Sequence, residues 1–230
     1  MQSLCWNNDG ELFALMRQYL FTAVVGDVMD KLGLTHQFLP PAVQALQEDT
    51  VLIGRAMTVL ECDCAGTEIA SEGRDKPFGR MFEALDSLKE NQVYLCAGAS
   101  PRYACFGSLM ATRALKVGAA GAVIEGFIRD TRDLKRMGFP IFSTGRYAQD
   151  QGVRGRVVDF GCPLEFSNGV RACQNDLIFG DIDGVLIVPA ERETEIIRLA
   201  FEKVLGEQVV RKALEDGVTS EKVFAELGIM

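Results

Sequence analysis

The feature that most constrains the fold is a strand-like pattern that occurs twice around a helical one. Two short apolar stretches, residues 92–97 and 121–128, enclose residues 107–117, whose apolar positions recur with helical spacing. Gly118 stands where that helix would end. Parallel strands of one sheet need a crossover of roughly a dozen residues or more, usually a helix. The pattern therefore predicts a strand–helix–strand unit in a parallel sheet.

Helical patterns stand before and after this unit. Residues 11–32 predict a helix that breaks near Thr22, whose hydroxyl is suited to cap the second half, and that ends at Gly33. A long amphipathic helix is expected over residues 191–215, and a last helix from about residue 219 to Gly228.

The remaining elements complete a mixed α/β pattern. Residues 66–78 are polar and predict a loop or a loose helix. Helices are expected over residues 78–90 and 130–137, and strands over residues 50–64 (interrupted at Gly54), 139–144 and parts of 154–189. No internal repeat or linker separates these elements. Residues 1–230 are therefore expected to form a single α/β domain, with C-terminal helices from about residue 191.

Charge and composition narrow the class of protein. The formal net charge is −8, and an acidic surface repels phosphate backbones, so no nucleic-acid partner is expected. The most apolar stretch, residues 117–128, is too short to span a bilayer and contains Glu125, and the N-terminus carries no signal pattern. The seven cysteines include no CxxC pair. They indicate buried, reduced thiols and a cytoplasmic location, with no membrane partner.

The only histidine limits the catalytic chemistry. His36 follows a predicted helix end, and a surface or packing role is expected for it. Acid–base chemistry then falls to carboxylates, lysine, tyrosine or metal-bound water. The chain has no GxxxxGK[ST] loop and no GxGxxG after a strand, which argues against kinases and dinucleotide-binding enzymes.

Arg129 and Asp130 are the strongest local signal for a functional site. Both follow the second predicted strand directly, at the sheet edge where open α/β folds bind ligands. An arginine there can hold a carboxylate by two hydrogen bonds, and an aspartate offers the hard oxygen that Mg²⁺ or Mn²⁺ prefers. Asp133 is placed to support the water shell of such a metal. The alternative is a solvated, charged turn with local ion pairs.

The start of the predicted helix supplies a second candidate element at the same edge. Gly107 allows close approach, and the free N–H groups of Leu109 and Met110 are expected to point at an anion, aided by the helix dipole. These residues and Ser108 are therefore predicted to bind substrate. Alternatively, or in addition, Ser108 caps the helix.

The residues around these positions resemble a known family. The segment FGSLMATRALKVGAAGAVIEGFIRD is similar to the signature of the RraA-like family, and the resemblance extends to TAVVGDVMDKLG, GRAMTV and NDLIFGDIDGVLIVP. It covers roughly residues 20–200. The family comprises 4-hydroxy-4-methyl-2-oxoglutarate aldolases, oxaloacetate decarboxylases and the RraA regulators of ribonuclease E. The resemblance implies a compact, layered α/β/β domain of the swivelling β/β/α type, assembled into a homotrimer or hexamer with sites between subunits.

The resemblance also implies roles for individual residues. Arg129 is expected to bind the carboxylate of a pyruvate-like group, and Asp130 to ligate the divalent metal, Mg²⁺ or Mn²⁺. The amides of Leu109 and Met110 are expected to hold the oxo acid, and Asp133 matches the acidic residue of the decarboxylases. Family aldolases carry an aspartate at the position of Ser108, and many relatives carry a glycine. Ser108 therefore puts strict aldolase identity in question.

These expectations define a function and its rivals. The sequence predicts a metal-dependent carbon–carbon lyase that acts on small 2-oxo acids through a pyruvate enolate, by aldol cleavage or by decarboxylation of oxaloacetate. One alternative is a non-catalytic regulator that binds a ribonuclease. Another is an enzyme for a different oxo or sugar acid.

Overall fold

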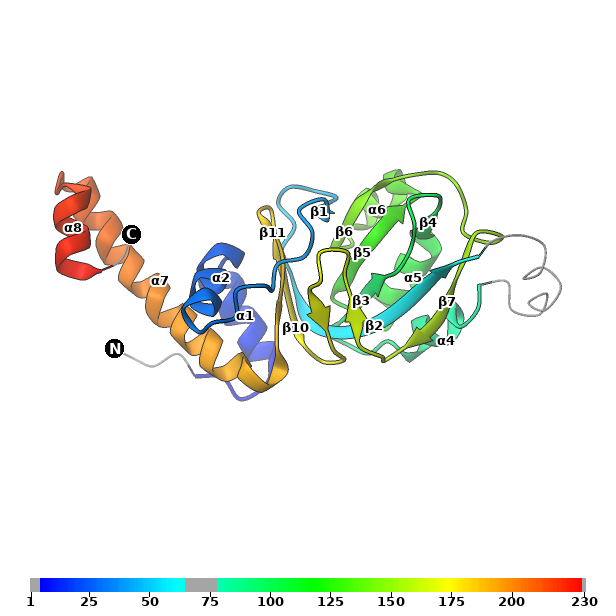
Figure 1. The fold of residues 1–230 in the computed structure, drawn as a ribbon, viewed down its shortest axis with the longest axis horizontal. Coiled ribbons are helices and arrows are strands. Elements are labelled where there is room, and N and C mark those ends of the chain that lie inside the picture. Colours follow the sequence, from blue (N-terminus) through cyan, green and yellow to red (C-terminus); the bar gives the residue numbers. More distant parts are fainter. Residues whose placement is uncertain (1–4, 65–77, 229–230) are drawn as a thin grey trace. The chain divides into compact units, whose positions relative to one another are not determined.

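The computed structural model describes residues 5–64 and 78–228, which divide into two compact units. The helical unit comprises residues 5–35 and 191–228, and the sheet unit comprises His36–Ala190 (Figure 1). All but the last residue of the segment 66–78, expected as a loop or loose helix, lies outside the described residues. The expectation of a single domain over the whole chain stays a prediction.

A mixed sheet forms the body of the sheet unit. Its order is β1-β6-β5-β3-β2-β10-β11, with β4 paired to β5 and β7 paired to β2. The pairs β2–β3, β3–β5, β4–β5 and β5–β6 are parallel, and the others are antiparallel. The strands are β1 (Gln44–Ala45), β2 (Leu52–Asp63), β3 (Gln92–Ala97), β4 (Ala104–Phe106), β5 (Gly121–Ile128), β6 (Ile141–Arg146), β7 (Gly155–Phe160), β10 (Leu177–Asp181) and β11 (Gly184–Val188).

The predicted strand–helix–strand unit is confirmed as β3, α5 and β5. The helix α5 (Ser108–Lys116) ends near Gly118, which adopts φ +78, and β3 and β5 pair in parallel. The sheet also curves until it nearly closes. Phe38 bridges Leu186, and the Leu39 amide donates to the Val185 carbonyl over 2.8 Å, so β11 approaches the segment that leads into β1.

The strand β2 runs through Gly54 without a break, so the expected interruption there is wrong. Both neighbours of β2 hold it in register, since Gly54 pairs with Ile178 of β10 and Arg55 pairs with Gln92 of β3. A Cβ at position 54 would lie 2.6 Å from the Asn91 carbonyl oxygen. The glycine thus provides close packing against a neighbouring backbone rather than a chain break.

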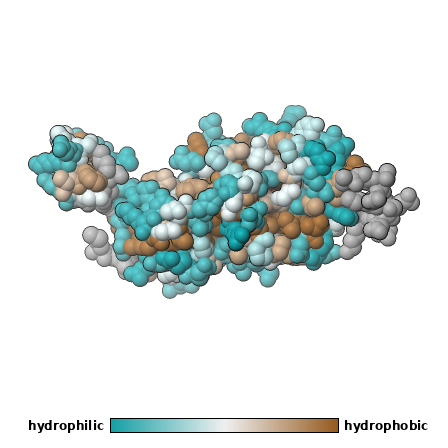
Figure 2. Space-filling model, viewed as in Figure 1, coloured by the Kyte–Doolittle hydropathy of each residue, from teal (hydrophilic) through white to brown (hydrophobic). Residues whose placement is uncertain are grey.

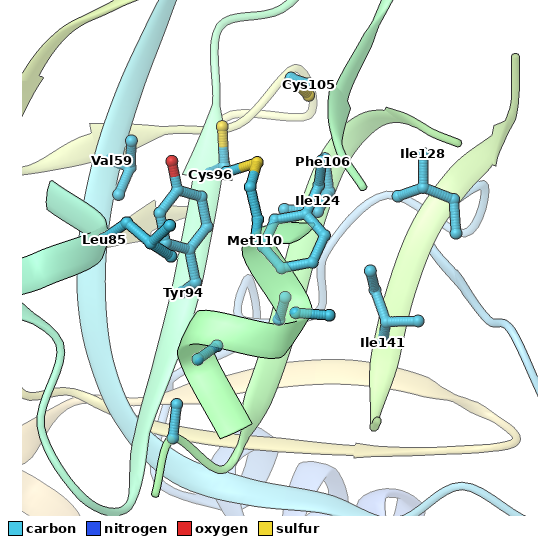
Figure 3. Packing of buried hydrophobic residues seen from close by; sticks show 14 of the residues in the cluster. Val59, Leu85, Tyr94, Cys96, Cys105, Phe106, Met110, Ile124, Ile128 and Ile141 are labelled. Atoms are coloured by element: carbon cyan, nitrogen blue, oxygen red, sulfur yellow. The ribbon is translucent and has the colours of Figure 1, made fainter. Parts of the chain in front are cut away.

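Side chains alternate between two buried clusters on opposite faces of the sheet. Along β3, Tyr94 and Cys96 join one cluster, while Val93, Leu95 and Ala97 join the other. Buried residues of α4 (Met81–Ser87), α5 and α6 (Thr131–Met137) cover the first face, and Figure 3 shows part of that cluster. Residues of the small hairpin β8 (Leu164–Glu165) and β9 (Arg171–Ala172) pack into the second cluster. Because both faces are covered, most side chains of the central strands β3 and β5 are apolar and buried.

Four helices make up the described part of the helical unit: α1 (Asp9–Tyr19), α2 (Thr22–Lys31), α7 (Glu193–Glu215) and α8 (Ser220–Leu227). The helix α2 packs against α7. Phe21, not Thr22, holds the capping position of α2, and Thr22 is the buried first residue of the helix, so the predicted cap is wrong. Lys203 of α7 pairs with Glu207 and, over 3.1 Å, with Asp27 of α2.

Two surface properties bear on the expectations from composition. Figure 2 shows hydrophobic patches among mostly hydrophilic side chains on the visible face. No single helix in the described residues has the length and apolarity to cross a bilayer, although α1 and α2, bent by 103°, pass that test as a pair.

Of the cysteines, Cys64, Cys96 and Cys105 are buried. Cys5, Cys62 and Cys173 are exposed, so the expectation of burial holds only for part of the set.

Candidate functional site

Arg129 and Asp130 lie at the carboxyl end of β5, as the sequence predicted. The Arg129 amide donates to the Phe106 carbonyl over 3.0 Å, which ties the end of β5 to β4. Asp130 adopts φ 58 and ψ 32, a left-handed conformation, and its carbonyl accepts from the Asp133 and Leu134 amides. This conformation turns the chain sharply from the strand into α6. A non-glycine residue in it costs about 1–3 kcal/mol, and such strain concentrates at functional sites.

The Asp130 carboxylate is held by the start of α5. Its Oδ2 accepts hydrogen bonds from the Ser108 amide over 3.0 Å and from the Ser108 hydroxyl over 2.9 Å. Gly107, rather than Ser108, occupies the capping position of α5, so the expectation that Ser108 caps the helix is wrong. The Ser108 hydroxyl instead fixes the orientation of the Asp130 side chain.

Gly107 makes this contact between the helix and the turn possible. A Cβ on Gly107 would lie 2.8 Å from Asp130 Oδ2 and 3.3 Å from Arg129 Cγ. The backbone of Gly107 is extended, so the requirement for glycine comes from space and not from conformation. The sequence predicted that Gly107 allows another group to approach the backbone closely, and the structure shows that these groups are the side chains of Arg129 and Asp130.

Asp150 is a site residue that the sequence reasoning missed. Its Oδ1 lies 2.8 Å from a terminal nitrogen of the Arg129 guanidinium, and its Oδ2 accepts from the Gly152 amide over 3.1 Å. A bridge between Asp150 and Ala104 of β4 holds the backbone of this segment beside the sheet. Asp150 stands in a stretch with no strand or helix periodicity, so no local pattern connected it to Arg129.

Gly107, Arg129, Asp130 and Asp150 line one cavity of about 250 Å³, the Arg129 pocket. Arg129, Asp130 and Asp150 form its charged part. The other lining residues are apolar or uncharged: Phe78, Met81, Phe82, Leu85, Ala104, Cys105, Phe106, Gly107, Leu109, Met110 and Gln151. Figure 3 shows Leu85, Phe106 and Met110 in the buried cluster that forms the base of the pocket. Of the predicted site residues, Gly107, Leu109, Met110, Arg129 and Asp130 therefore line one cavity, whereas Ser108 and Asp133 do not.

The first turn of α5 offers hydrogen-bond donors to this pocket. Ala111 is the first residue of α5 whose amide donates to a backbone carbonyl, that of Gly107. Across the described chain, no protein group accepts from the Leu109 or Met110 amides. Helix amides in this position carry partial positive charge and bind anions. The predicted anion-binding donors are thus available beside Arg129.

Two predicted site residues do not line the pocket: Ser108, which contacts it only through Asp130, and Asp133. The Asp133 carboxylate lies 3.5 Å from the guanidinium of Arg136, and its side chain is 56% exposed. Its role in a metal's water shell stays a prediction.

The Asp130 carboxylate offers one oxygen to a divalent cation. Asp130 Oδ1 has no protein partner within residues 5–64 and 78–228, and a carboxylate oxygen is a ligand of choice for Mg²⁺ and Mn²⁺. The same residues contain no group of three or more histidine, cysteine, aspartate or glutamate side chains that could enclose a metal. The site thus fits a cation held by one carboxylate, with water and substrate completing its coordination.

Other polar candidates have structural contacts away from the Arg129 pocket. His36 hydrogen-bonds through Nε2 to the Asn168 carbonyl over 2.7 Å, and so supports the turn at Gly169. Asp181 accepts from the Asp183 amide in the hairpin between β10 and β11. These contacts give His36 and the Asp181 carboxylate structural roles outside the lining of the Arg129 pocket.

Comparison with known proteins finds a matching family model and relatives that align with most of this chain. Residues 22–187 match the sequence model of the RraA-like family, described as Aldolase/RraA. A protein of Halalkalibacterium halodurans named "Putative 4-hydroxy-4-methyl-2-oxoglutarate aldolase" is 28% identical over 208 residues, 89% of this chain and 90% of the relative. Protein DlpA of Legionella pneumophila is 26% identical over 203 residues, 87% of this chain. The chain spans only 31% of the length of DlpA.

A solved structure shows the same fold. Streptomyces coelicolor RraAS2, described as an unusual member of the RNase ES inhibitor RraA protein family, superposes with a TM-score of 0.75 at 24% identity. The superposition covers 90% of this chain and 99% of RraAS2. At this identity the likeness concerns the fold.

Proposed function

The chain belongs to the RraA-like family, and on that premise we propose that it is a divalent-metal-dependent carbon–carbon lyase for small 2-oxo acids. The observation that carries the proposal is the meeting of Arg129, Asp130 and the free amides of α5 in one cavity. Relatives named as 4-hydroxy-4-methyl-2-oxoglutarate aldolases support a lyase. Aldol cleavage and decarboxylation of oxaloacetate are both within the proposal.

Arg129 binds the substrate carboxylate in this proposal. One terminal nitrogen of its guanidinium pairs with Asp150, which leaves Nε and the second terminal nitrogen for a ligand. The Nε atom faces the start of α5, since a Cβ on Gly107 would lie 3.5 Å from it. A carboxylate there receives hydrogen bonds from Arg129 and lies near the amides of Leu109 and Met110. Binding by both elements orients the 2-oxo acid in the pocket.

The chemistry needs stabilisation of negative charge on the 2-oxo oxygen. In aldol cleavage the C3–C4 bond breaks, the C4 hydroxyl loses its proton, and the electron pair moves onto the pyruvate fragment as an enolate. In oxaloacetate the same bond breaks with loss of CO₂, and in both cases protonation at C3 gives pyruvate. A Mg²⁺ or Mn²⁺ ion held by Asp130 would supply positive charge for the developing enolate. Arg129 contributes fixed positive charge, and a substrate that covers the apolar lining would displace water from the pocket, which would strengthen these interactions.

Ser108 has a defined part in this arrangement. Its amide and hydroxyl hold Asp130 Oδ2, so Oδ1 is the oxygen that remains for the cation. A serine supplies no second carboxylate, so Asp130 and Asp150 are the acidic groups of the described pocket. Asp133, one helical turn beyond Asp130, is retained as a candidate for the outer water shell. Homotrimer or hexamer assembly and a cytoplasmic location remain part of the proposal.

Release of pyruvate tests the proposal directly. Oxaloacetate and 4-hydroxy-4-methyl-2-oxoglutarate are supplied with Mg²⁺ or Mn²⁺, and pyruvate is measured by coupling to lactate dehydrogenase. Metal without protein gives the uncatalysed background. Turnover above that background, lost with EDTA and in Asp130→Ala, is expected; Asp86→Ala, which removes an exposed carboxylate that pairs with Arg113, serves as the matched control.

The outcome also separates the rival functions. Full activity in Asp130→Ala contradicts the role of Asp130. Absence of pyruvate from either substrate, together with capture of a ribonuclease, favours the regulator. Turnover restricted to some other oxo or sugar acid would favour the remaining alternative, an enzyme for that different acid.

A further inference from the structure

We infer that the half of the substrate distal to the 2-oxo acid is a compact apolar group rather than a second carboxylate. This inference rests on the proposed function, and it concerns the end of the Arg129 pocket that the proposal leaves unassigned. The two ends of the pocket differ in chemistry. The end formed by Arg129, Asp130 and Asp150 is charged, and the remaining lining is apolar apart from Gln151.

The apolar wall comes from α4, from the start of α5 and from Phe78, which precedes α4. The helix α4 contributes Met81, Phe82 and Leu85. Phe78 packs edge-on against Phe82 with ring centroids 5.7 Å apart, so the two rings form one aromatic surface. Phe82 is nevertheless 56% exposed, as large apolar side chains beside ligand sites often are. A substrate group that covers this surface gains by removing it from water.

Charge at the pocket argues against a distal carboxylate. Among the described lining residues Arg129 is the only cation, and it already pairs with Asp150 and serves the 2-oxo acid carboxylate. The Gln151 side-chain nitrogen lies 3.6 Å from the Met81 sulfur, to which it donates. A second substrate carboxylate would therefore face apolar side chains with no cationic partner from the described residues. Placing an unpaired charge in such surroundings is unfavourable.

The size of the cavity limits the apolar group. Pockets for small ligands usually enclose about 300–1,000 Å³. The Arg129 pocket, at about 250 Å³, lies below that range and must also hold the 2-oxo acid. The C4 substituent is therefore limited to a small group, such as a short alkyl chain or a single aromatic ring. The corresponding reaction converts a 4-hydroxy-2-oxo acid with an apolar C4 substituent into pyruvate and an apolar aldehyde. The C4 hydroxyl loses its proton and becomes the aldehyde carbonyl, the C3–C4 bond breaks to give the enolate, and C3 takes up one proton from solvent.

The test compares substrates that differ only at the distal end. Pyruvate release is measured from 4-hydroxy-2-oxoheptanoate, 4-hydroxy-4-phenyl-2-oxobutanoate and 4-hydroxy-4-methyl-2-oxoglutarate under the same metal conditions. We expect kcat/KM for at least one apolar substrate to exceed that for the dicarboxylate by about tenfold or more. An equal or higher value for the dicarboxylate overturns the inference and leaves the proposed function standing. No pyruvate from any of these substrates or from oxaloacetate overturns the proposed function, and this inference with it.

A charge placed in the apolar wall gives an independent readout. Phe82→Arg adds a cation beside the apolar end of the pocket and is expected to shift the ratio of kcat/KM values toward the dicarboxylate by about tenfold. Leu115→Arg is the matched control, because Leu115 lies exposed on α5 outside the pocket lining. The control adds the same charge and is expected to leave the ratio unchanged. An unchanged ratio in Phe82→Arg contradicts the assignment of this wall to the distal group.

Discussion

The Asp130 carboxylate and Ser108, 22 positions apart, are joined by two hydrogen bonds to the same oxygen, one from the Ser108 amide and one from its hydroxyl. The contact links the turn after β5 to the first residue of α5. The two hydrogen bonds fix the orientation of the Asp130 carboxylate, and its Oδ1 has no protein partner among the described residues. Ser108 therefore acts on Asp130 as a hydrogen-bond donor.

Removal of the Ser108 hydroxyl tests this positioning role. Ser108→Ala keeps the amide donor and loses the hydroxyl donor, and a hydrogen bond to a charged group is worth about 1.5–3 kcal/mol. We expect kcat/KM to fall by about tenfold and the metal concentration for half-maximal activity to rise. Ser87→Ala is the control, because Ser87 donates only to the Ala84 carbonyl on α4. Unchanged metal dependence in Ser108→Ala would contradict the role.

Gly107→Ala tests the close packing at the same place. The new methyl group would stand 2.8 Å from Asp130 Oδ2, so the Asp130 side chain must move. We expect a loss of roughly tenfold or more in kcat/KM, because small misplacements of catalytic groups have large effects on rate. Gly10→Ala in α1 introduces the same methyl group in a helix and should leave activity intact. A fully active Gly107→Ala protein would show that Asp130 tolerates displacement.

Arg129→Lys separates charge from geometry. A lysine keeps the positive charge, but its donors all lie on one nitrogen, so it cannot contact Asp150 and also bind a carboxylate in the two-point geometry of a guanidinium. We expect kcat/KM to fall by about tenfold or more in Arg129→Lys and by a further factor in Arg129→Ala, measured as pyruvate release. Arg113→Lys, at the exposed pair with Asp86, is the control and should retain activity. Equal activity of Arg129→Lys and the unmodified protein would argue against two-point binding of the carboxylate.

Glu61 makes stability depend on pH. Its side chain is 2% exposed, and burial raises the pKa of its carboxyl to about 8. The Tyr103 hydroxyl lowers this pKa, and the nearby Asp63 raises it further. The folded protein thus holds a proton that the unfolded chain releases above about pH 4.5. This contribution to stability is complete below pH 4.5 and is lost as the pH rises through about 8.

The Glu61→Gln variant isolates that contribution. The amide keeps the shape of the protonated carboxyl and cannot ionise. We expect Tm of the variant, measured by thermal unfolding from pH 5 to pH 9, to gain on that of the unmodified protein as the pH rises. A constant difference in Tm across that range would show that Glu61 does not titrate in the folded protein as expected.

Local sequence patterns predicted much of the sheet unit. The apolar runs of β3 and β5 and the helical spacing of α5 are properties of neighbouring residues, so the strand–helix–strand unit follows from periodicity. The position of Arg129 and Asp130 follows in turn, because residues after a parallel strand stand at the carboxyl edge of the sheet. The helix α6 likewise ends at Gly138, with φ 62, where the helix predicted over residues 130–137 ends.

The sequence by itself thus determined the α/β pattern, the edge at which the site lies and the residue types available there. Only the tertiary structure decided that Asp150 pairs with Arg129, that Ser108 donates to Asp130, and that an apolar wall from α4 completes the cavity. Thr22 and Gly54 show the same limit, since burial in a helix start and packing against Asn91 replaced the cap and the break that local rules predicted. Contacts between residues far apart in the chain leave no periodic trace, because the register and packing that create them are properties of the whole fold.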